Sequence, residues 1–115
     1  MTDENRKDKS MLTNDNIRDA VYEIVPASII EQIIVFGSQA RGDNTEDSDT
    51  DICVIVTNQL TRNEIKIYRY ELNKLFASKY RVPTDILIKS SYDYGRFKNQ
   101  IGAIEYAIAS EGVVI

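Results

Sequence analysis

The 115-residue sequence contains no histidine, and this absence removes several classes of catalytic chemistry. Without imidazole there is no Ser-His or Cys-His nucleophile, no histidine general base and no histidine metal ligand. The only cysteine, Cys53, lies in the apolar run DICVIV, so the sequence predicts a buried thiol and excludes a disulfide framework. Any catalysis must therefore rely on carboxylates, lysine, tyrosine or a metal ion.

The sequence also lacks a long apolar run and an excess of positive charge. No segment approaches the ~20 apolar residues that cross a bilayer, and the charged N-terminus MTDENRKDKS does not resemble a signal peptide. We therefore expect a cytoplasmic protein that binds no membrane. The 14 basic and 18 acidic residues give a net charge of −4, which argues against a chain that binds long nucleic acid on its own.

Length and composition fit one folded domain. A hydrophobic content of 43% is sufficient for a real core in a chain of this size. Residues 1–12 mix charges of both signs without periodicity, so we predict a flexible tail at 1–12 and a single domain at 13–115. The oligomeric state cannot be read from the sequence, and a homo-oligomer remains open.

The spacing of apolar residues predicts the element order αβ(short α)βαβα. Helices are expected from residue 13 or 14 to 25, from the Thr61–Glu64 capping box to about 80, and from about 91 to 111. In the last region Phe97, Ile101, Ile104 and Ile108 recur at helical spacing, Gly112 ends the helix, and Gly95 or Gly102 can break it. Strands are expected at 33–36, 50–56 and 84–88. The predicted fold class is α+β in two layers, a small mixed three-stranded sheet with helices packed on it.

The segment GSQARGDNTEDSDTD, at residues 37–51, carries the chemistry. Alternate residues on a strand face the same side about 6.6 Å apart, so Asp49 and Asp51 can direct both carboxylates at one point. Two such carboxylates make a site for a hard cation. Gly37 and Ser38 form a turn whose free backbone N–H groups and hydroxyl can hold a phosphate. A divalent metal beside a phosphate indicates phosphoryl or nucleotidyl transfer.

Strand directions bring a third carboxylate to the same place. The Gly-Ser turn meets the two aspartates only if the first two strands run antiparallel, which the polar loop between them permits. The helix that joins the second and third strands is long enough for a parallel right-handed crossover. Asp85, near the start of the third strand, then lies at the same sheet edge. A strand-start aspartate after Pro83 is the alternative interpretation of Asp85.

These residues resemble the nucleotidyltransferase superfamily that includes DNA polymerase beta, kanamycin nucleotidyltransferase and the minimal nucleotidyltransferases. The family pattern is Gly-Ser, ten residues, then Asp-x-Asp, with a third aspartate on a later strand; Gly37, Ser38, Asp49, Asp51 and Asp85 match it. Small members also favour GSxARG, which residues 37–42 fit without a substitution. The resemblance extends from about residue 14 to the C-terminus and includes a closing Glu-Gly turn at 111–112. It implies the polymerase beta-like palm fold.

The resemblance also implies a mechanism. Asp49 and Asp51 would hold two Mg²⁺ ions against the triphosphate of ATP, and Asp85 would bind the catalytic ion and lower the pKa of the acceptor hydroxyl. Ser38 and nearby backbone amides, including that of Gly37, would hold the β and γ phosphates. Arg41 would steady the pyrophosphate, although a salt bridge to an acid of the same loop is the alternative.

The acceptor is the open question. Minimal nucleotidyltransferases of this size are frequently paired with a small helical HEPN protein, so the resemblance implies an antitoxin that transfers AMP onto a HEPN toxin. Transfer to a small molecule such as an aminoglycoside is the second hypothesis. A catalytically silent subunit that inhibits its partner by binding is the third. ATP as the nucleotide is implied only by the family.

Overall fold

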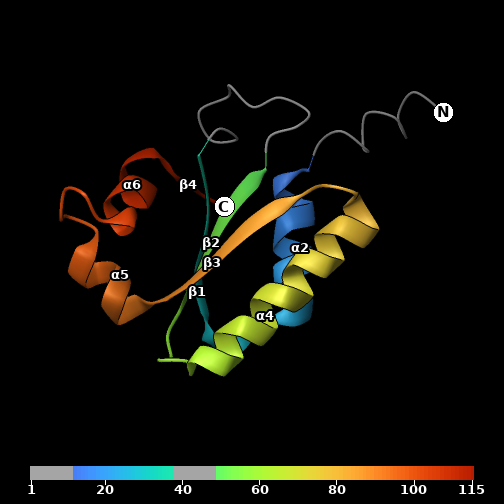
Figure 1. Cartoon of the computed structure of the whole chain (residues 1–115), viewed down its shortest axis with the longest axis horizontal. Helices are drawn as coiled ribbons and strands as arrows, with labels where there is room; N and C mark the ends of the chain where they lie inside the picture. Colours follow the sequence, from blue (N-terminus) through green and yellow to red (C-terminus); the bar gives the residue numbers. More distant parts are fainter. Residues whose placement is uncertain (1–11, 38–48) are drawn as a thin grey trace.

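A mixed four-stranded sheet with the order β3-β2-β1-β4 forms the centre of the molecule (Figure 1). The computed structural model describes residues 12–37 and 49–115. Residues 1–11, the predicted short helix, Ser38 and Arg41 lie outside the described residues. Leu12, which we assigned to the tail, is buried in the core with 6% of its surface exposed.

The first described helix, α2, covers Asn14–Ile24. The Thr13 hydroxyl caps it by accepting a hydrogen bond of 3.0 Å from the backbone N–H of Asn16. Helical spacing places Ile17, Ala20 and Val21 on one buried face. A short 3₁₀ turn, η1 (Ala27–Ile29), follows and leads into the sheet. The predicted first helix is confirmed.

The strands β1 (Ile30–Phe36) and β2 (Thr50–Val56) pair antiparallel, as predicted, with Phe36 opposite Asp51. β2 has the predicted bounds. β1 begins three residues earlier than predicted, because polar Glu31 and Gln32 interrupt the apolar signal at an irregularity in the strand pairing.

The long helix after β2 is α4 (Arg62–Leu75), continued by a π-helical segment, η2 (Phe76–Tyr80). The predicted capping box is present: the backbone N–H of Glu64 donates to the Thr61 hydroxyl over 3.1 Å, and the Thr61 N–H donates to the Glu64 carboxylate over 2.8 Å. Arg81, in the left-handed conformation with φ of 58°, ends the helix. β3 (Thr84–Ser90) then pairs parallel to β2, which confirms the predicted parallel direction of these two strands.

The C-terminal helical region is broken at one of the two predicted glycines. It forms two helices, α5 (Ser91–Phe97) and α6 (Ile104–Glu111), with a turn between them in which Gly102 has φ of 98°, whereas Gly95 lies within α5. Ile101 lies in this turn and is 82% exposed, so its predicted place in a helical stripe is wrong. The sheet has four strands and not three, because β4 (Val113–Val114) pairs antiparallel with β1. Two residues are too few to give a periodic signal.

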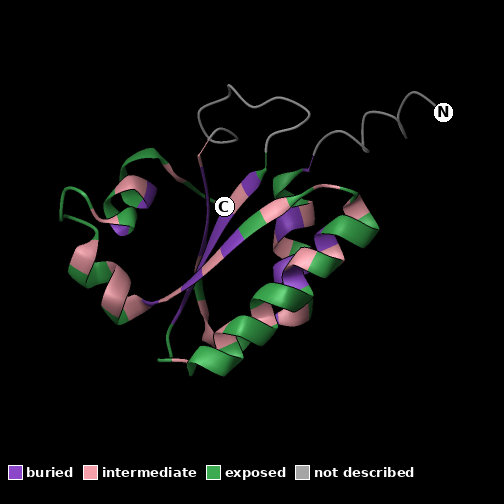
Figure 2. Ribbon diagram, viewed as in Figure 1, coloured by how far each residue is buried: buried purple, intermediate pink, exposed green. Residues whose placement is uncertain are grey.

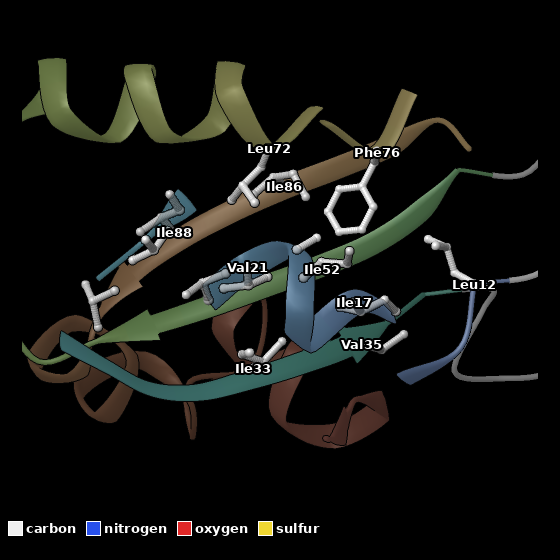
Figure 3. Packing of buried hydrophobic residues seen from close by; sticks show 14 residues of the cluster. Leu12, Ile17, Val21, Ile33, Val35, Ile52, Leu72, Phe76, Ile86 and Ile88 are labelled. Carbon is white, nitrogen blue, oxygen red and sulfur yellow. The ribbon is translucent and has the colours of Figure 1, made fainter. Parts of the chain in front are cut away.

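The sheet separates two apolar clusters, and burial is highest in its central strands (Figure 2). The larger cluster lies between the sheet and the helical segments α2, α4 and η2, from which Val21, Leu72 and Phe76 contact the strands (Figure 3). The smaller cluster lies between the sheet and α5 and α6 and contains Ile34, Phe36, Cys53, Ile55 and Ile108. No helix in the described residues is long and apolar enough to cross a membrane.

Candidate active site

Asp51 and Asp85 are partners in the parallel pairing of β2 and β3. Neighbouring strands lie about 4.8 Å apart, and paired residues project from the same face of the sheet. Cys53 and Leu87, two positions further along each strand, belong to the smaller cluster, so both aspartates lie on the face covered by α5 and α6. Asp51 is half-buried and Asp85 is exposed. The structure thus brings together two of the three predicted carboxylates.

Asp49 lies immediately before β2 and is exposed to solvent. It precedes Asp51 by two positions, at the end of the sheet where β1 ends and where β2 and β3 begin. The structure therefore places Asp49 at the predicted edge, beside the strand and not within it.

The backbone of Gly37, the residue after β1, lies close to the carboxylate of Asp51. Its φ is 72°, a left-handed backbone conformation that residues other than glycine rarely adopt. A Cβ atom at this position would lie 2.0 Å from Oδ2 and 3.0 Å from Cγ of Asp51. The absence of a side chain on Gly37 is what allows the backbone to approach this carboxylate. Ser38 and Arg41 follow directly in the chain, outside the described residues, and their roles stay predictions.

Two hydrogen bonds fix the strand starts that carry the aspartates. The backbone N–H of Thr50 donates to the carbonyl of Pro83 over 3.1 Å. The Thr84 hydroxyl donates to Oδ1 of Asn73, on α4, over 2.8 Å. Sequence reasoning missed Asn73. The only signal that it offered was an asparagine, a poor helix former, near the end of a helix.

The donor atoms at this edge fit Mg²⁺. Carboxylate oxygens are hard ligands, and Mg²⁺ is commonly held by one or two carboxylates, with water and substrate phosphates completing its shell. Within the described stretches, no group of three His, Cys, Asp or Glu side chains is positioned to hold a metal ion. Asp51 and Asp85 could hold the ion together with phosphate or water, which is the usual arrangement in nucleotide sites.

A second polar group lies further from the edge on the same face. Lys89 of β3 forms a salt bridge of 3.3 Å with Glu105 of α6, and Glu105 is buried. Burial raises the pKa of the Cys53 thiol to about 12, while the nearby Lys89 ammonium acts in the opposite direction. The pKa of Tyr94 is also raised, by burial first and by Cys53 second. This group lies between the sheet and the helices α5 and α6.

One relative in sequence is a candidate protein adenylyltransferase from Methanocaldococcus jannaschii. It is 39% identical over 59 residues, which are 51% of this chain and 54% of that protein. The chain therefore matches about half the length of this relative.

Several solved structures share the fold. A mutant of the toxin–antitoxin pair MntA–HpeT has a TM-score of 0.66 at 19% identity, over 90% of this chain and 72% of that one. A toxin–antitoxin structure with AMP-PNP has a TM-score of 0.64 at 21% identity, over 89% and 72%. A Shewanella oneidensis complex of tri-AMPylated HEPN toxin with MNT antitoxin has a TM-score of 0.57 at 19% identity, over 87% and 66%. At these identities the likeness establishes the fold.

The family itself follows from a comparison over most of the chain. A family model described as a nucleotidyltransferase domain matches residues 15–109. This range includes both described strand starts, Gly37 and all three aspartates. The resemblance inferred from GSQARG and Asp-x-Asp is thus confirmed, and the chain belongs to the nucleotidyltransferase domain family.

Proposed function

We propose that this chain transfers AMP from ATP to a hydroxyl group on a small helical HEPN-type protein, with Mg²⁺ as the cofactor, and so acts as an antitoxin. The observation that carries the chemistry is the pairing of Asp51 with Asp85 at the sheet edge where β1 ends and where Gly37 approaches Asp51. Two carboxylates beside a glycine turn, in a chain of this family, provide metal ligands and a phosphate site together.

The residues divide the work as follows. Asp49 and Asp51 would hold two Mg²⁺ ions against the triphosphate, and Asp85 would complete the site nearest the acceptor hydroxyl. When bound, Mg²⁺ supplies charge neutralisation at the attacking and leaving oxygens. Gly37 and Ser38 bind the β and γ phosphates through backbone N–H groups and the serine hydroxyl. Arg41 stabilises the pyrophosphate as it leaves.

The relatives support a protein as the acceptor. The Methanocaldococcus relative is described as a candidate protein adenylyltransferase. The Shewanella complex contains a HEPN toxin that carries three AMP groups, together with an MNT antitoxin. In the MntA–HpeT mutant, two aspartates spaced two positions apart were replaced by glutamate, the spacing of Asp49 and Asp51 here.

The test is a mass measurement on the partner protein. The chain is incubated with ATP, Mg²⁺ and the product of a neighbouring gene that encodes a small helical protein. We expect the partner to gain the mass of one or more AMP groups, and Asp49→Asn, Asp51→Asn or Asp85→Asn to abolish the gain. Asp19→Asn, an exposed carboxylate on α2, is the matched control and should leave transfer unchanged.

Each alternative has its own outcome in this experiment. If Asp51→Asn inhibits the partner as strongly as the wild-type chain does, and the partner gains no mass with either, the chain is a binding module. Transfer to an aminoglycoside, but not to the protein, would replace the protein acceptor by a small molecule. Parallel reactions with GTP, CTP and UTP establish the nucleotide preference.

A further inference from the structure

Asp85 lies on a strand that has, among the described residues, a strand neighbour on one side only. β3 is at the edge of the sheet and pairs with β2. Asp85 is the second residue of β3, and it follows a turn with Arg81 in the left-handed conformation and Pro83. The first residues of an edge strand separate from the sheet more easily than those of a central strand. The position of the Asp85 carboxylate therefore depends on whatever fixes the start of β3.

The side chain of Thr84 provides such a fixed point. Its hydroxyl donates to Oδ1 of Asn73 over 2.8 Å, and this hydrogen bond is partly buried. Asn73 belongs to α4, which packs on the larger cluster through Leu72. The hydrogen bond thus joins the loose end of an edge strand to a helix that is held by the core.

Strand geometry transmits this constraint to Asp85. Thr84 and Asp85 are consecutive, so their side chains project to opposite faces of the sheet. The bond from Thr84 to Asn73 keeps Thr84 on the face of α4, which leaves Asp85 on the face of Asp51. A shift by one residue would exchange the two faces. On the other side, the Thr50 N–H holds the carbonyl of Pro83 over 3.1 Å, so Thr84 is held from both directions.

We infer that Asn73 is a positioning residue, which through the Thr84 hydroxyl holds the Asp85 carboxylate beside that of Asp51 for metal binding. The inference rests on the proposed function, because it assigns Asp85 a role in that site. Asn73 lies on the opposite face of the sheet from the aspartates and needs no contact with substrate. Groups that hydrogen-bond a metal ligand directly change metal affinity or activity by about 10- to 100-fold when they are removed, and Asn73 acts one residue away from the ligand, so we expect an effect at the lower end of this range.

Thr84 and Asn73 each offer a pair of matched variants. Thr84→Val keeps the branched shape and loses the hydroxyl, whereas Thr84→Ser keeps the hydroxyl and loses the methyl group. Asn73→Leu loses the acceptor, whereas Asn73→Asp keeps an acceptor oxygen. Leu75→Ala, in the same helix, is the control for lost stability, because Leu75 packs against the larger cluster.

The measurement is Mn²⁺ binding by calorimetry in the presence of α,β-methylene ATP, which cannot be transferred. We expect Thr84→Val and Asn73→Leu each to raise the Kd for Mn²⁺ by about tenfold or more, and Thr84→Ser and Asn73→Asp to stay near the wild-type value. The double variant Asn73→Leu with Thr84→Val should bind Mn²⁺ no more weakly than either single variant, because both substitutions remove the same hydrogen bond. Amide hydrogen exchange at Thr50 and Asp85 should accelerate in the same variants.

Several outcomes overturn the inference. If Thr84→Val and Asn73→Leu leave the Mn²⁺ affinity unchanged, Asn73 does not position Asp85. If Leu75→Ala lowers the Mn²⁺ affinity as much as they do, Asn73 contributes only to stability. Losses that add in the double variant would show that the two side chains act separately. The wild-type chain could bind Mn²⁺, and the variants could weaken this binding as expected, while the wild-type chain transfers no AMP. In that case the proposed function fails and the positioning role stands. No Mn²⁺ binding by the wild-type chain overturns both.

Discussion

The backbone of Gly37 lies against the carboxylate of Asp51 so closely that a Cβ atom on Gly37 would be 2.0 Å from Oδ2. Gly37 directly follows the last residue of β1, Phe36, and Asp51 is the residue opposite Phe36 on β2. The turn expected to hold phosphate and the carboxylate expected to hold metal are thus in direct contact. The spacing of Gly-Ser and Asp-x-Asp in the sequence reflects this contact between two antiparallel strands.

Gly37→Ala is therefore expected to destabilise the fold and to displace the Asp51 carboxylate. A φ of 72° costs an alanine about 1–2 kcal/mol relative to glycine, and the clash with Asp51 adds to that cost. Urea denaturation should show a lower free energy of unfolding by at least this amount. Transfer activity should fall by more than the loss of folded protein explains.

Gly95→Ala is the control for this substitution. Gly95 lies inside α5, and, apart from its chain neighbours and the backbone of its own helix, no described atom comes within 4 Å of a Cβ atom built on it. Alanine is the better helix former by about 1 kcal/mol, so Gly95→Ala should be neutral or stabilising. Equal stability of the Gly37→Ala and Gly95→Ala variants would contradict the strain assigned to Gly37.

Thr61→Ala should lower the free energy of unfolding by about 1 kcal/mol, because it removes the N-cap of α4. The substitution leaves the backbone N–H of Glu64 without its hydroxyl acceptor. Thr57→Ala, at an exposed threonine after β2, should change stability by less than about 0.5 kcal/mol. Urea denaturation of both variants compares the two, and similar values would show that the capping box does not stabilise the helix.

Much of the fold could be predicted because its elements have strong local signals. β2 is apolar on both faces since it lies at the centre of the sheet, and α4 begins with a capping box. β4 could not be predicted, because two residues give no period and their partner in β1 is remote in the chain. Ile101 kept a helical spacing across a turn at Gly102, so periodicity alone placed it in a helix.

The site divides in the same way. The placement of Asp51 and Asp85 at one sheet edge followed from strand direction and from the length of the connecting helix, both of which are visible in the sequence, whereas their exact pairing comes from the structure. The bond between Asn73 and Thr84 was not predictable, because it depends on which turn of α4 faces the start of β3. Such contacts between a helix and a strand are set by tertiary packing, for which the sequence carries no periodic signal.

The buried thiol of Cys53 predicts a loss of stability at high pH. The ordinary pKa of 9.0 describes the unfolded chain, and burial raises the pKa of the folded chain to about 12. The protonated thiol thus contributes its full stability below pH 9, and this contribution is lost as the pH rises from 9 toward 12. The loss approaches about 1.4 kcal/mol per pH unit within that window.

Urea denaturation of the wild type and of Cys53→Ala at pH 8, 9 and 10 isolates this effect from the titration of lysine and tyrosine. The free energy of unfolding of the wild type should fall more steeply with pH than that of the variant. The thiol should also resist disulfide reagents in the folded chain at pH 8 and react in urea, because the thiolate is the reactive form. Parallel pH profiles, or fast reaction in the folded chain, would contradict the burial of Cys53.

The ion pair between Lys89 and Glu105 lies largely buried between the sheet and α6, so removal of one partner should cost more than removal of both. Glu105 is buried and Lys89 is mostly covered, so Glu105→Leu leaves a desolvated ammonium without its counter-charge. We expect this variant to lose about 1–3 kcal/mol, below the range for fully buried pairs because Lys89 keeps some exposure. Lys89→Met with Glu105→Leu should recover much of that loss, since two apolar side chains can pack against the smaller cluster.

Glu23→Gln, on the exposed surface of α2, is the control and should change the free energy of unfolding by less than about 0.5 kcal/mol. Urea denaturation of the wild type and the three variants gives the free energy of unfolding of each. A double variant as unstable as Glu105→Leu would mean that the charges, and not the apolar contacts around them, hold α6 to the sheet.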